Sequence, residues 1–352
     1  MELKPTAPTR IERAAAWVIV LAGVIFCLTY FSTLLQPIVV AVMIWYCVFE
    51  LRRFLQKAKV KGRTLPTGLA NLFAFGIIFL VGWGFFEIII INLEMIIKKS
   101  PSYAANFQAM VNELQTIRQF NEVQERVLGR LEAIDLQPLL TRILNSLTSV
   151  AGNVFVIIIY VAFMLVEEKF FYRKLHALSD TADKQGNLDR VMDQMVKSIR
   201  QYMSVKTQMS LLTAVLSYFI LLAFGVDFAV LWAFLIFVLN YIPYIGSFLA
   251  TLLPAAFAMF QFQSGWMLAW VFLAIQVVQF GIGNVLEPKI MGRQLNLSPL
   301  GVMLALTFWG AIWGVLGMFL SVPITSVMVI SFSRFESTRF IAVWLSETGD
   351  PG

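Results

Sequence analysis

Long apolar stretches without charge alternate with short charged segments over most of the chain. A membrane-spanning helix needs about 20 apolar residues, and a charge near its centre is costly. Residues 14–49, 64–86, 143–166 and 294–333 carry no charge, and Asp227 is the only charge between Lys206 and Glu287. The pattern predicts six full membrane-spanning helices near residues 14–35, 37–55, 68–92, 147–167, 207–225 and 265–285.

Two further apolar segments, 228–262 and 299–334, are interrupted by helix-breaking residues. The first contains Asn-Tyr-Ile-Pro-Tyr-Ile-Gly-Ser at 240–247, and glycines with Pro323 punctuate the second. Proline removes a backbone donor, glycine loosens a helix, and freed carbonyls in hydrocarbon need partners inside the protein. We interpret both segments as re-entrant helical hairpins, the first entered from outside and the second from the cytoplasmic side. Secondary transporters use such an inverted pair to build a site at mid-membrane.

The second interrupted segment also has a feature that favours an ordinary tilted crossing. At about 100° per residue, five small residues lie within about 80° of one helical face. A continuous helix would use such a stripe to pack against a neighbour, so this alternative stays open. The five residues are Thr307, Gly310, Gly314, Gly317 and Ser321.

The charged segments between the spans have helical periodicity of their own. Residues 93–146 predict external amphipathic helices that begin near Ser100-Pro101 and continue through Val123, Val127 and Leu131. Residues 183–206 predict an amphipathic helix that lies along the cytoplasmic interface. The fold class is therefore an all-α polytopic membrane protein with six spans, two hairpins and amphipathic extramembrane helices. We divide the chain into the first three spans (1–92), the external segment (93–146), the fourth span with the cytoplasmic helix (147–206), a C-terminal transport core (207–335) and a cytoplasmic tail (336–352).

The distribution of basic residues predicts the orientation. If the spans alternate, 21 of the 27 Lys and Arg residues fall on one side. The positive-inside rule makes that side cytoplasmic and places both termini there.

Composition agrees with lipid as the main solvent. Hydrophobic residues make up 59% of the chain and charged residues 14%, with a mean hydropathy of +0.77, whereas soluble domains carry about 25% charged residues. This excludes an ordinary soluble enzyme, a disordered chain and a disulfide scaffold. One His and two Cys leave almost no room for a His/Cys metal cluster, and we expect no cofactor.

Other function classes find little support. The chain lacks a Gly-x-x-x-x-Gly-Lys-Ser/Thr loop, so ATP is not expected to drive it directly. We see no nucleic-acid motif, and the basic balance fits topology and anionic lipids. The predicted spans contain no His and no carboxylate pair at catalytic spacing, which makes a membrane enzyme the weakest option.

The two hairpins and the last span supply a candidate substrate path. Gln276, Gln279, Gly283 and Glu287 lie within about 80° on a helical wheel, and amides in lipid are unfavourable unless they face protein or water. A solute-facing wall and interhelical hydrogen bonding explain this stripe equally well. The proposed path consists of Asn240, Tyr241, Pro243, Tyr244, Gly246, Ser247, Gln276, Gln279, Asn284, Gly310, Gly314 and Gly317.

Two carboxylates are candidates for ion coupling. Glu287 precedes Pro288 near the cytoplasmic end of its span, where a solvated carboxylate or one paired with Lys289 or Arg293 is the simpler explanation. Asp227, the second candidate, follows Gly225-Val226 and is most simply the N-cap of the next helix.

Three motifs resemble the C-terminal half of the autoinducer-2 exporter (AI-2E) family: "NYIPYIGS" (240–247), "GNVLEPKIMGRQLNLSPLGVMLAL" (283–306) and "WGAIWGVLGMFLSVP" (309–323). The resemblance covers nearly the whole chain, although its N-terminal part is mostly hydropathy. It implies a multi-pass transporter of a bacterial inner (plasma) membrane that exports small molecules as a homo-oligomer, for which a pentamer is one form. The family motif positions found here are Asn240, Pro243, Gly246, Pro288, Gly292, Pro299, Gly310, Gly314, Gly317 and Pro323.

The first hypothesis for function is a secondary transporter that exports a small polar solute, similar to autoinducer-2, by alternating access. An uncharged solute fits the path better than an anion, because the path contains no Lys or Arg. H⁺ or Na⁺ would couple the cycle. The alternatives are a Na⁺(Li⁺)/H⁺ antiporter on the same scaffold and a passive oligomeric channel.

Overall fold

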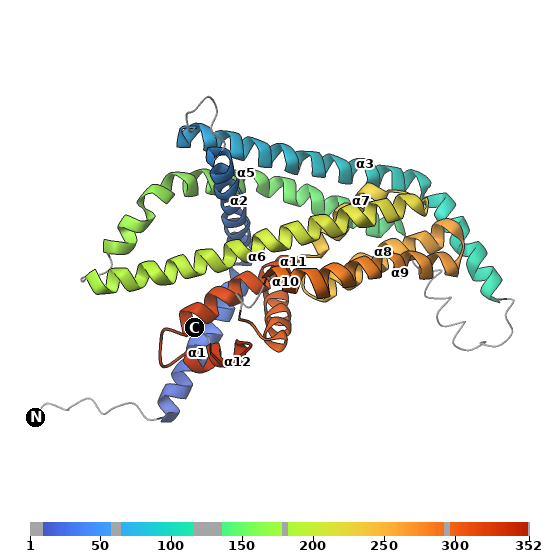
Figure 1. Ribbon diagram of the computed structural model, residues 1–352. Helices are drawn as coiled ribbons and strands as arrows, with labels where there is room; N and C mark the ends of the chain where they lie inside the picture. The colour runs from blue at the N-terminus through green and yellow to red at the C-terminus, as the bar shows by residue number, and fades with distance from the viewer. Residues whose placement is uncertain (1–9, 58–64, 116–135, 178–181, 292–295, 351–352) are drawn as a thin grey trace, which may run out of the picture.

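The computed structural model describes residues 10–57, 65–115, 136–177, 182–291 and 296–350, and these residues form helices and no strands. Figure 1 shows the helices in chain order. Their bounds are α1 Arg10–Tyr30, α2 Ser32–Lys57, α3 Thr67–Gln115, α5 Leu136–Ala177, α6 Ala182–Ala223, α7 Ala229–Leu239, α8 Ile245–Phe262, α9 Gly265–Phe280, the π-helix η1 Gly281–Leu286, α10 Glu287–Met291, α11 Pro299–Phe332 and α12 Arg339–Leu345.

The fold class predicted from the sequence is confirmed. Within the described residues, six helices are long and apolar enough to cross a membrane. These are α2, α3, α6, α8, the run from α9 to α10, and α11. Two of them, α8 and α11, belong to hairpins, while the predicted spans near 14–35 and 147–167 correspond to α1 and α5.

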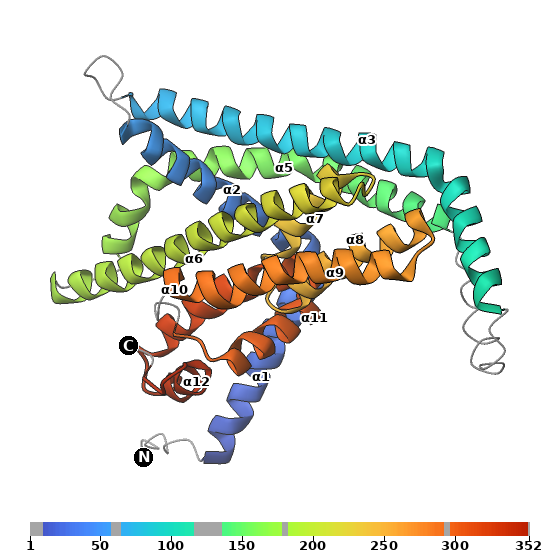
Figure 2. The same cartoon turned by 45° about the vertical axis from the view of Figure 1, so that its right-hand side comes forward.

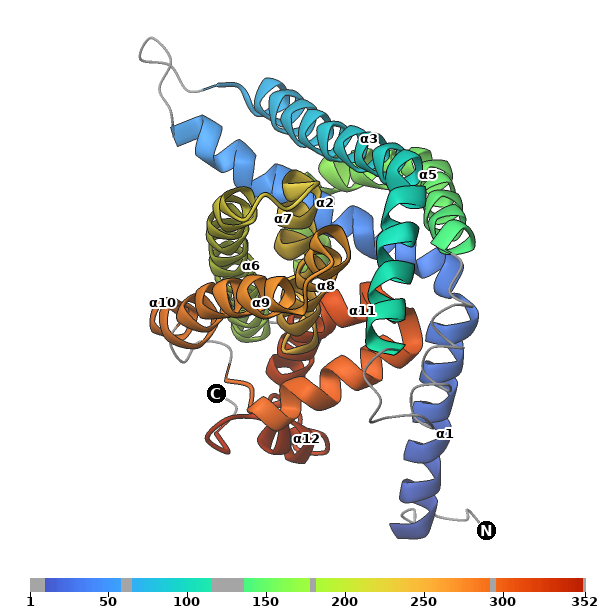
Figure 3. The ribbon, with the colours of Figure 1, turned by 90° about the vertical axis from the view of Figure 1, so that its right-hand side faces the viewer.

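In the C-terminal half, helix α6 contacts both hairpin segments and the last long span. It is uninterrupted over 42 residues, about 63 Å at 1.5 Å per residue, and is seen nearly end-on in Figure 3 with α7, α8 and α9 beside it. The expectation of a separate interface helix at 183–206 is therefore wrong. Its apolar face packs on protein instead, because Ile199 and Tyr202 contact a core formed with Val329 of α11 and Ala342 of α12.

Helix α3 also continues further than expected. It runs through Ser100-Pro101 to Gln115 without the predicted new start. Asn106, beyond this point, donates hydrogen bonds to the carbonyl oxygens of Phe260 and Gln261, both 3.3 Å away. The end of α3 thus lies against the end of α8, whereas Val123, Val127 and Leu131 lie outside the described residues.

Helices α7 and α8 form the first hairpin. Its two ends meet, because the Gln261 amide bonds to the Gly225 carbonyl oxygen and accepts from the Asp227 backbone N–H, each at 2.8 Å. Helix α7 has 11 residues, about 16 Å, which is too short for a bilayer core of about 30 Å. This segment enters and leaves at one end of the bundle, as predicted.

The second hairpin lies within α11. Gly314 has φ 61° and ψ −138°, which reverses the chain inside a segment of otherwise helical residues. The two arms then come so close that a Cβ on Gly317 would lie 1.8 Å from the Trp309 carbonyl oxygen. A continuous tilted crossing is therefore wrong for this segment.

The bases of the two hairpins lie at opposite ends of α6. The first hairpin's base contains Gly225, directly after α6. At the other base, the Arg334 guanidinium donates to Gln194 in the first third of α6, at 2.8 Å. Figure 2 shows α7 near one end of α6.

The N-terminal half forms a separate layer of α2, α3 and α5 along one side of the bundle (Figure 3). Arg52 of α2, 7% exposed, makes a two-pronged bond to Glu168 of α5 at 2.6 and 3.0 Å and also donates to Asn71 of α3 at 3.0 Å. A charge-assisted bidentate pair of this kind is strong and fixes orientation, so Arg52 joins three helices at one end of the layer.

Candidate functional site

The tip of the first hairpin reaches α6 and the second hairpin. Tyr241, 6% exposed, shares a 2.7 Å hydrogen bond between its hydroxyl and that of Thr207 on α6. Its ring stacks on Phe319 of the second hairpin, with centroids 4.6 Å apart and planes 23° from parallel. The two hairpins therefore meet at one point, which we call the tip junction and define by Tyr241, Thr207 and Phe319.

Local chemistry explains why the chain turns at this tip. Helix α7 ends at Leu239, and Tyr244 has a positive φ of 58°, a region that non-glycine residues enter only at a cost. A Cβ on Gly246 would lie 1.9 Å from the Leu239 carbonyl oxygen. Glycine is thus required at 246 for close approach of the two arms, and Pro243 prevents a continuous helix.

A largely buried ion pair adjoins the tip junction. The ammonium of Lys206, next to Thr207 on α6, lies 2.7 Å from the Glu287 carboxylate at the start of α10, and the two side chains are only 13% and 17% exposed. Tyr202, one turn earlier on α6 and 4% exposed, belongs to the same apolar cluster as Tyr241. Burial of a charged pair is costly unless both partners stay in place, so this pair locks α10 to α6.

The two arms of the second hairpin are held together by a hydrogen bond and a close contact. The Trp309 indole of its first arm donates to the Thr325 hydroxyl of its second arm at 3.2 Å. Gly310 lies so close to the other arm that a Cβ there would be 2.9 Å from the Met318 side chain. Trp313 also donates to the Leu28 carbonyl oxygen at 3.0 Å, which ties this hairpin to α1.

Several buried polar atoms around the two hairpins lack a hydrogen-bond partner among the described residues. They include Oδ1 of Asn240, Nε2 of Gln279, Oγ of Ser210 and the hydroxyl of Tyr202. Burial of a polar atom without a hydrogen bond lowers stability, by up to several kcal/mol where the surroundings are fully apolar. Water or a polar solute would satisfy these atoms, which gives the bundle interior a polar character.

The structure separates the predicted path residues into two groups. Tyr241 and Gly246 are buried at the first tip, Asn240 is half-buried there, and Gln279 is 6% exposed. Tyr244 is 53% exposed, and Ser247 donates to its carbonyl oxygen at 2.9 Å. Pro243 and Gln276 are half-buried, Asn284 and Gly314 are exposed, Gly310 is half-buried and Gly317 is buried.

The polar stripe predicted on the last span is interrupted. Gly281–Leu286 is a π-helix, which has more residues per turn than an α-helix and shifts the faces on either side of it. Gln279 before it is buried, while Gly283 and Asn284 within it are exposed. The π-helix ends at Leu286, and the carboxylate of the next residue, Glu287, accepts a hydrogen bond from the Lys206 ammonium. The pairing with Lys289 considered from sequence is therefore not the one found, and Arg293 lies outside the described residues.

Asp227 is not an N-cap. Helix α7 is preceded by Phe228 with no side-chain cap, and the Asp227 carboxylate instead accepts from the Lys99 ammonium at 2.7 Å and the Tyr103 hydroxyl at 2.8 Å. Partial burial acts to raise the pKa of Asp227, but the bonds from Lys99 and Tyr103 outweigh it and hold that pKa below its ordinary value. Asp227 therefore stays ionised and joins the base of the first hairpin to α3.

Sequence reasoning missed Lys206, Thr207, Tyr202 and Phe319. One signal was available: Lys206 and Glu287 are the charges that border a stretch in which Asp227 is the single charge. If the first hairpin returns to the side from which it enters, Lys206 and Glu287 fall on the same face of the membrane, where they can form an ion pair. The described residues contain no group of three or more His, Cys, Asp or Glu side chains able to hold a metal ion.

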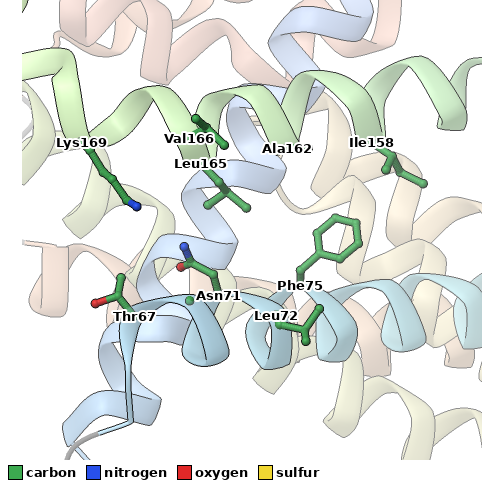
Figure 4. Close-up of a pocket in the computed structure, with 10 residues that line it drawn as sticks. Thr67, Asn71, Leu72, Phe75, Ile158, Ala162, Leu165, Val166 and Lys169 are labelled. Atoms are coloured by element: carbon green, nitrogen blue, oxygen red, sulfur yellow. The ribbon is translucent and has the colours of Figure 1, made fainter.

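Two open pockets lie away from the tip junction. One, of about 520 Å³, lies between α3, the end of α6 and the start of α7, and Lys99 and Asp227 line it. The other, of about 400 Å³, lies between the start of α3 and α5 (Figure 4).

The long apolar helices are those of a multi-pass membrane protein, and two broken hairpins with opposed bases are an arrangement that secondary transporters use. A family model described as "AI-2E family transporter" matches residues 15–336. The chain belongs to the AI-2E family of transporters, and the resemblance drawn from its motifs is confirmed.

Named relatives agree with this family. The chain is 32% identical over 296 residues to a "Putative transport protein" of Haemophilus influenzae, covering 82% of this chain and 84% of the relative. It is 36% identical over 210 residues to AI-2 transport protein TqsA of Escherichia coli (strain K12), covering 59% of this chain and 60% of TqsA. A "Putative transport protein" of Borreliella burgdorferi is 26% identical over 343 residues, covering 96% of this chain and 91% of the relative.

Proposed function

We propose that this transporter exports a small, uncharged polar solute across a bacterial inner membrane by alternating access, with both termini in the cytoplasm. The observation that carries the proposal is the meeting of two oppositely based hairpins at Tyr241 and Phe319 beside the Lys206–Glu287 pair. Because each hairpin returns to its own end of the bundle, movement of one tip against α6 opens a path on one side only. Similarity to TqsA makes an autoinducer-2-like signal the first solute to test.

Glu287 is the proposed coupling group, and its role works through Lys206. Protonation of the carboxylate, or a Na⁺ ion that binds it, would remove the attraction that holds α10 to α6. The lock would then open next to Thr207, which holds the tip of the first hairpin. The cation gradient and the movement of the solute would then both act at the contact between α6 and α10.

The same contact supports a second candidate function. A cation/proton antiporter needs at least one carboxylate that exchanges a proton for Na⁺ or Li⁺, and the largely buried carboxylate of Glu287 is the one proposed for this exchange. Growth of an expressing strain at high Na⁺ or Li⁺, compared with efflux of the signal, would separate this candidate from solute export.

Flux into inverted vesicles tests the proposal, with a panel of neutral and anionic solutes and with or without an imposed H⁺ or Na⁺ gradient. We expect saturable uphill uptake of a neutral polar solute that depends on one gradient. Downhill flux alone at every concentration would indicate a channel and contradict the proposal.

A charge-neutral double variant separates coupling from simple stability. Glu287→Gln alone leaves Lys206 without its partner, so it loses transport under either explanation. In the double variant Lys206→Gln, Glu287→Gln, no charge is left unpaired. A purely structural pair predicts restored, gradient-dependent transport, whereas a coupling carboxylate predicts solute flux that no longer responds to the gradient.

A further inference from the structure

The pocket between α3 and α5 has two chemically different ends. Figure 4 shows the side chains of both helices pointing into the space between them, with Lys169, Thr67 and Asn71 at one end. Phe75 and Ile158 lie toward the other end, where the lining is apolar. The pocket is therefore a groove with a polar head and an apolar tail.

Lys169 is the feature that needs an explanation. Its charged neighbours are already neutralised, because Glu168 pairs with Arg52 and Glu167 pairs with Lys174. Lys169 makes no ion pair with any residue that the structure describes. Among the described residues, no carboxylate pairs with this ammonium, which stands at the polar end of an apolar groove.

Two neutral donors stand beside this ammonium. Oδ1 of Asn71 accepts from Arg52 at 3.0 Å, which turns the amide so that its NH₂ group remains as a donor. Thr67, the first residue of α3, adds a hydroxyl at the same end of the pocket. The polar head thus offers one cation and two hydrogen-bond donors, a set suited to a phosphate oxygen.

The length of the groove fits one lipid leaflet. Ile158 and Lys169 lie on the same helix, about 16 Å apart along its axis at 1.5 Å per residue. A leaflet is about half of a hydrocarbon core that is about 30 Å thick. An acyl chain on the apolar wall would therefore place its phosphate near Lys169.

We propose that the α3–α5 groove binds one anionic phospholipid from the leaflet on the Lys-rich side of the membrane, with its phosphate at Lys169, Thr67 and Asn71. Six basic residues precede α3 in the segment 52–63, and such segments attract anionic lipids. A second copy of the chain fits less well, because it would have to bring its own anion to Lys169. The proposal does not depend on the transported solute.

Native mass spectrometry of the full-length, delipidated protein tests the groove, with phosphatidylglycerol and phosphatidylcholine of identical acyl chains as probes. Lys169→Ala removes the cation, and Ala162→Trp fills the groove, because Ala162 lines it and is exposed. Matched controls are Lys197→Ala, an exposed lysine on α6, and Phe163→Trp, a neighbouring position that is 69% exposed and does not line the pocket.

We expect Lys169→Ala to weaken phosphatidylglycerol binding about fivefold, the size of one lysine–lipid interaction, and to leave phosphatidylcholine binding unchanged. Ala162→Trp should weaken both lipids, and neither control should change either. Equal binding by Lys169→Ala and Lys197→Ala would overturn the proposal. A change in the mass of the oligomer without a change in bound lipid would also overturn it, and would make the groove an interface between copies.

Discussion

The two hairpins reach the same junction but reverse the chain by different physical means. The first uses a short turn after α7, with Pro243, a positive φ at Tyr244 and close approach at Gly246. The second reverses within one run of helical residues through the φ and ψ of Gly314, and Gly317 then allows the arms to touch. The tips are also held differently: Tyr241 bonds to α6, whereas Trp309 bonds to its own hairpin. The tip of the first hairpin is thus hydrogen-bonded to α6, whereas the arms of the second are hydrogen-bonded to each other and, through Trp313, to α1.

The largest expected effect comes from the two close-approach glycines. Gly246→Ala and Gly317→Ala would each place a Cβ within 2 Å of a backbone carbonyl oxygen, at 1.9 and 1.8 Å. Backbone cannot move aside as a flexible side chain can, so we expect each to destabilise the protein by about 3 kcal/mol or more. Thermal unfolding in detergent measures this.

Gly283→Ala is the matched control for these two variants, since it meets nothing within 4 Å. It should unfold within about 0.5 kcal/mol of the parent chain. If Gly246→Ala and Gly317→Ala were as stable as this control, the arms of the hairpins would not be in contact.

The Gly314→Ala variant separates the cost of an unfavourable backbone conformation from the cost of a steric clash. At Gly314 a Cβ meets open space, but φ is 61°, so Gly314→Ala costs only backbone strain, about 1–3 kcal/mol. The strain falls on the second hairpin alone. Hydrogen exchange should increase in α11 and stay unchanged in α7, and an equal increase in both would contradict independent hairpins.

The anchoring bonds give the next prediction. Thr207→Val leaves the buried Tyr241 hydroxyl without its partner, and Thr325→Val does the same to the Trp309 indole. Each should cost about 1–2 kcal/mol of stability. Only Thr207→Val frees a tip from α6, so we expect it alone to alter transport rate per folded molecule in proteoliposomes. Equal rates for the two variants would show that the anchor has no part in the cycle.

Acid should loosen the first hairpin's base and leave the second's in place. The folded-state pKa of Asp227 is lowered, so its contribution is present above the ordinary Asp pKa of about 3.9 and disappears as pH falls through the lowered value. The bond from Arg334 to Gln194 has no such carboxylate. The effect is under about 1 kcal/mol for a partly exposed pair.

Hydrogen exchange at the start of α7, measured from pH 6 down to pH 3, checks this prediction. The rate, corrected for intrinsic pH dependence, should rise at the acid end and should be pH-independent in Asp227→Asn. A parallel rise at the start of α11 would show general acid unfolding instead.

The sequence indicated the hairpins because their chemistry is local. Pro243 and Gly246 lie three residues apart in the segment 240–247, and together they favour a break in the helix, so the first turn could be predicted from the residues. The second was ambiguous, because Gly310, Gly314 and Gly317 fit both a packing stripe and a reversal. The choice depends on the backbone angles of Gly314, which the residue type permits but does not require.

The errors have a common physical cause, which is competition from tertiary contacts. An amphipathic pattern at 183–206 fits a membrane interface as well as a protein groove, and packing against Val329 and Ala342 decided it. Asp227 was assigned to its own helix by local capping rules, yet Lys99 and Tyr103 from a distant helix bind it. The partner of Glu287 likewise comes from α6.

Labelling of single cysteines from each side of the membrane tests the central claim most directly. In a chain with Cys27 and Cys47 replaced by Ser, Val230→Cys and Gln263→Cys mark the two ends of the first hairpin, and Leu300→Cys and Glu336→Cys mark those of the second. A membrane-impermeant maleimide is applied to right-side-out and inverted vesicles. The account predicts that 230 and 263 react from outside and that 300 and 336 react from the cytoplasmic side. Reaction of the two ends of either hairpin from opposite sides would mean a full crossing, and would contradict the account.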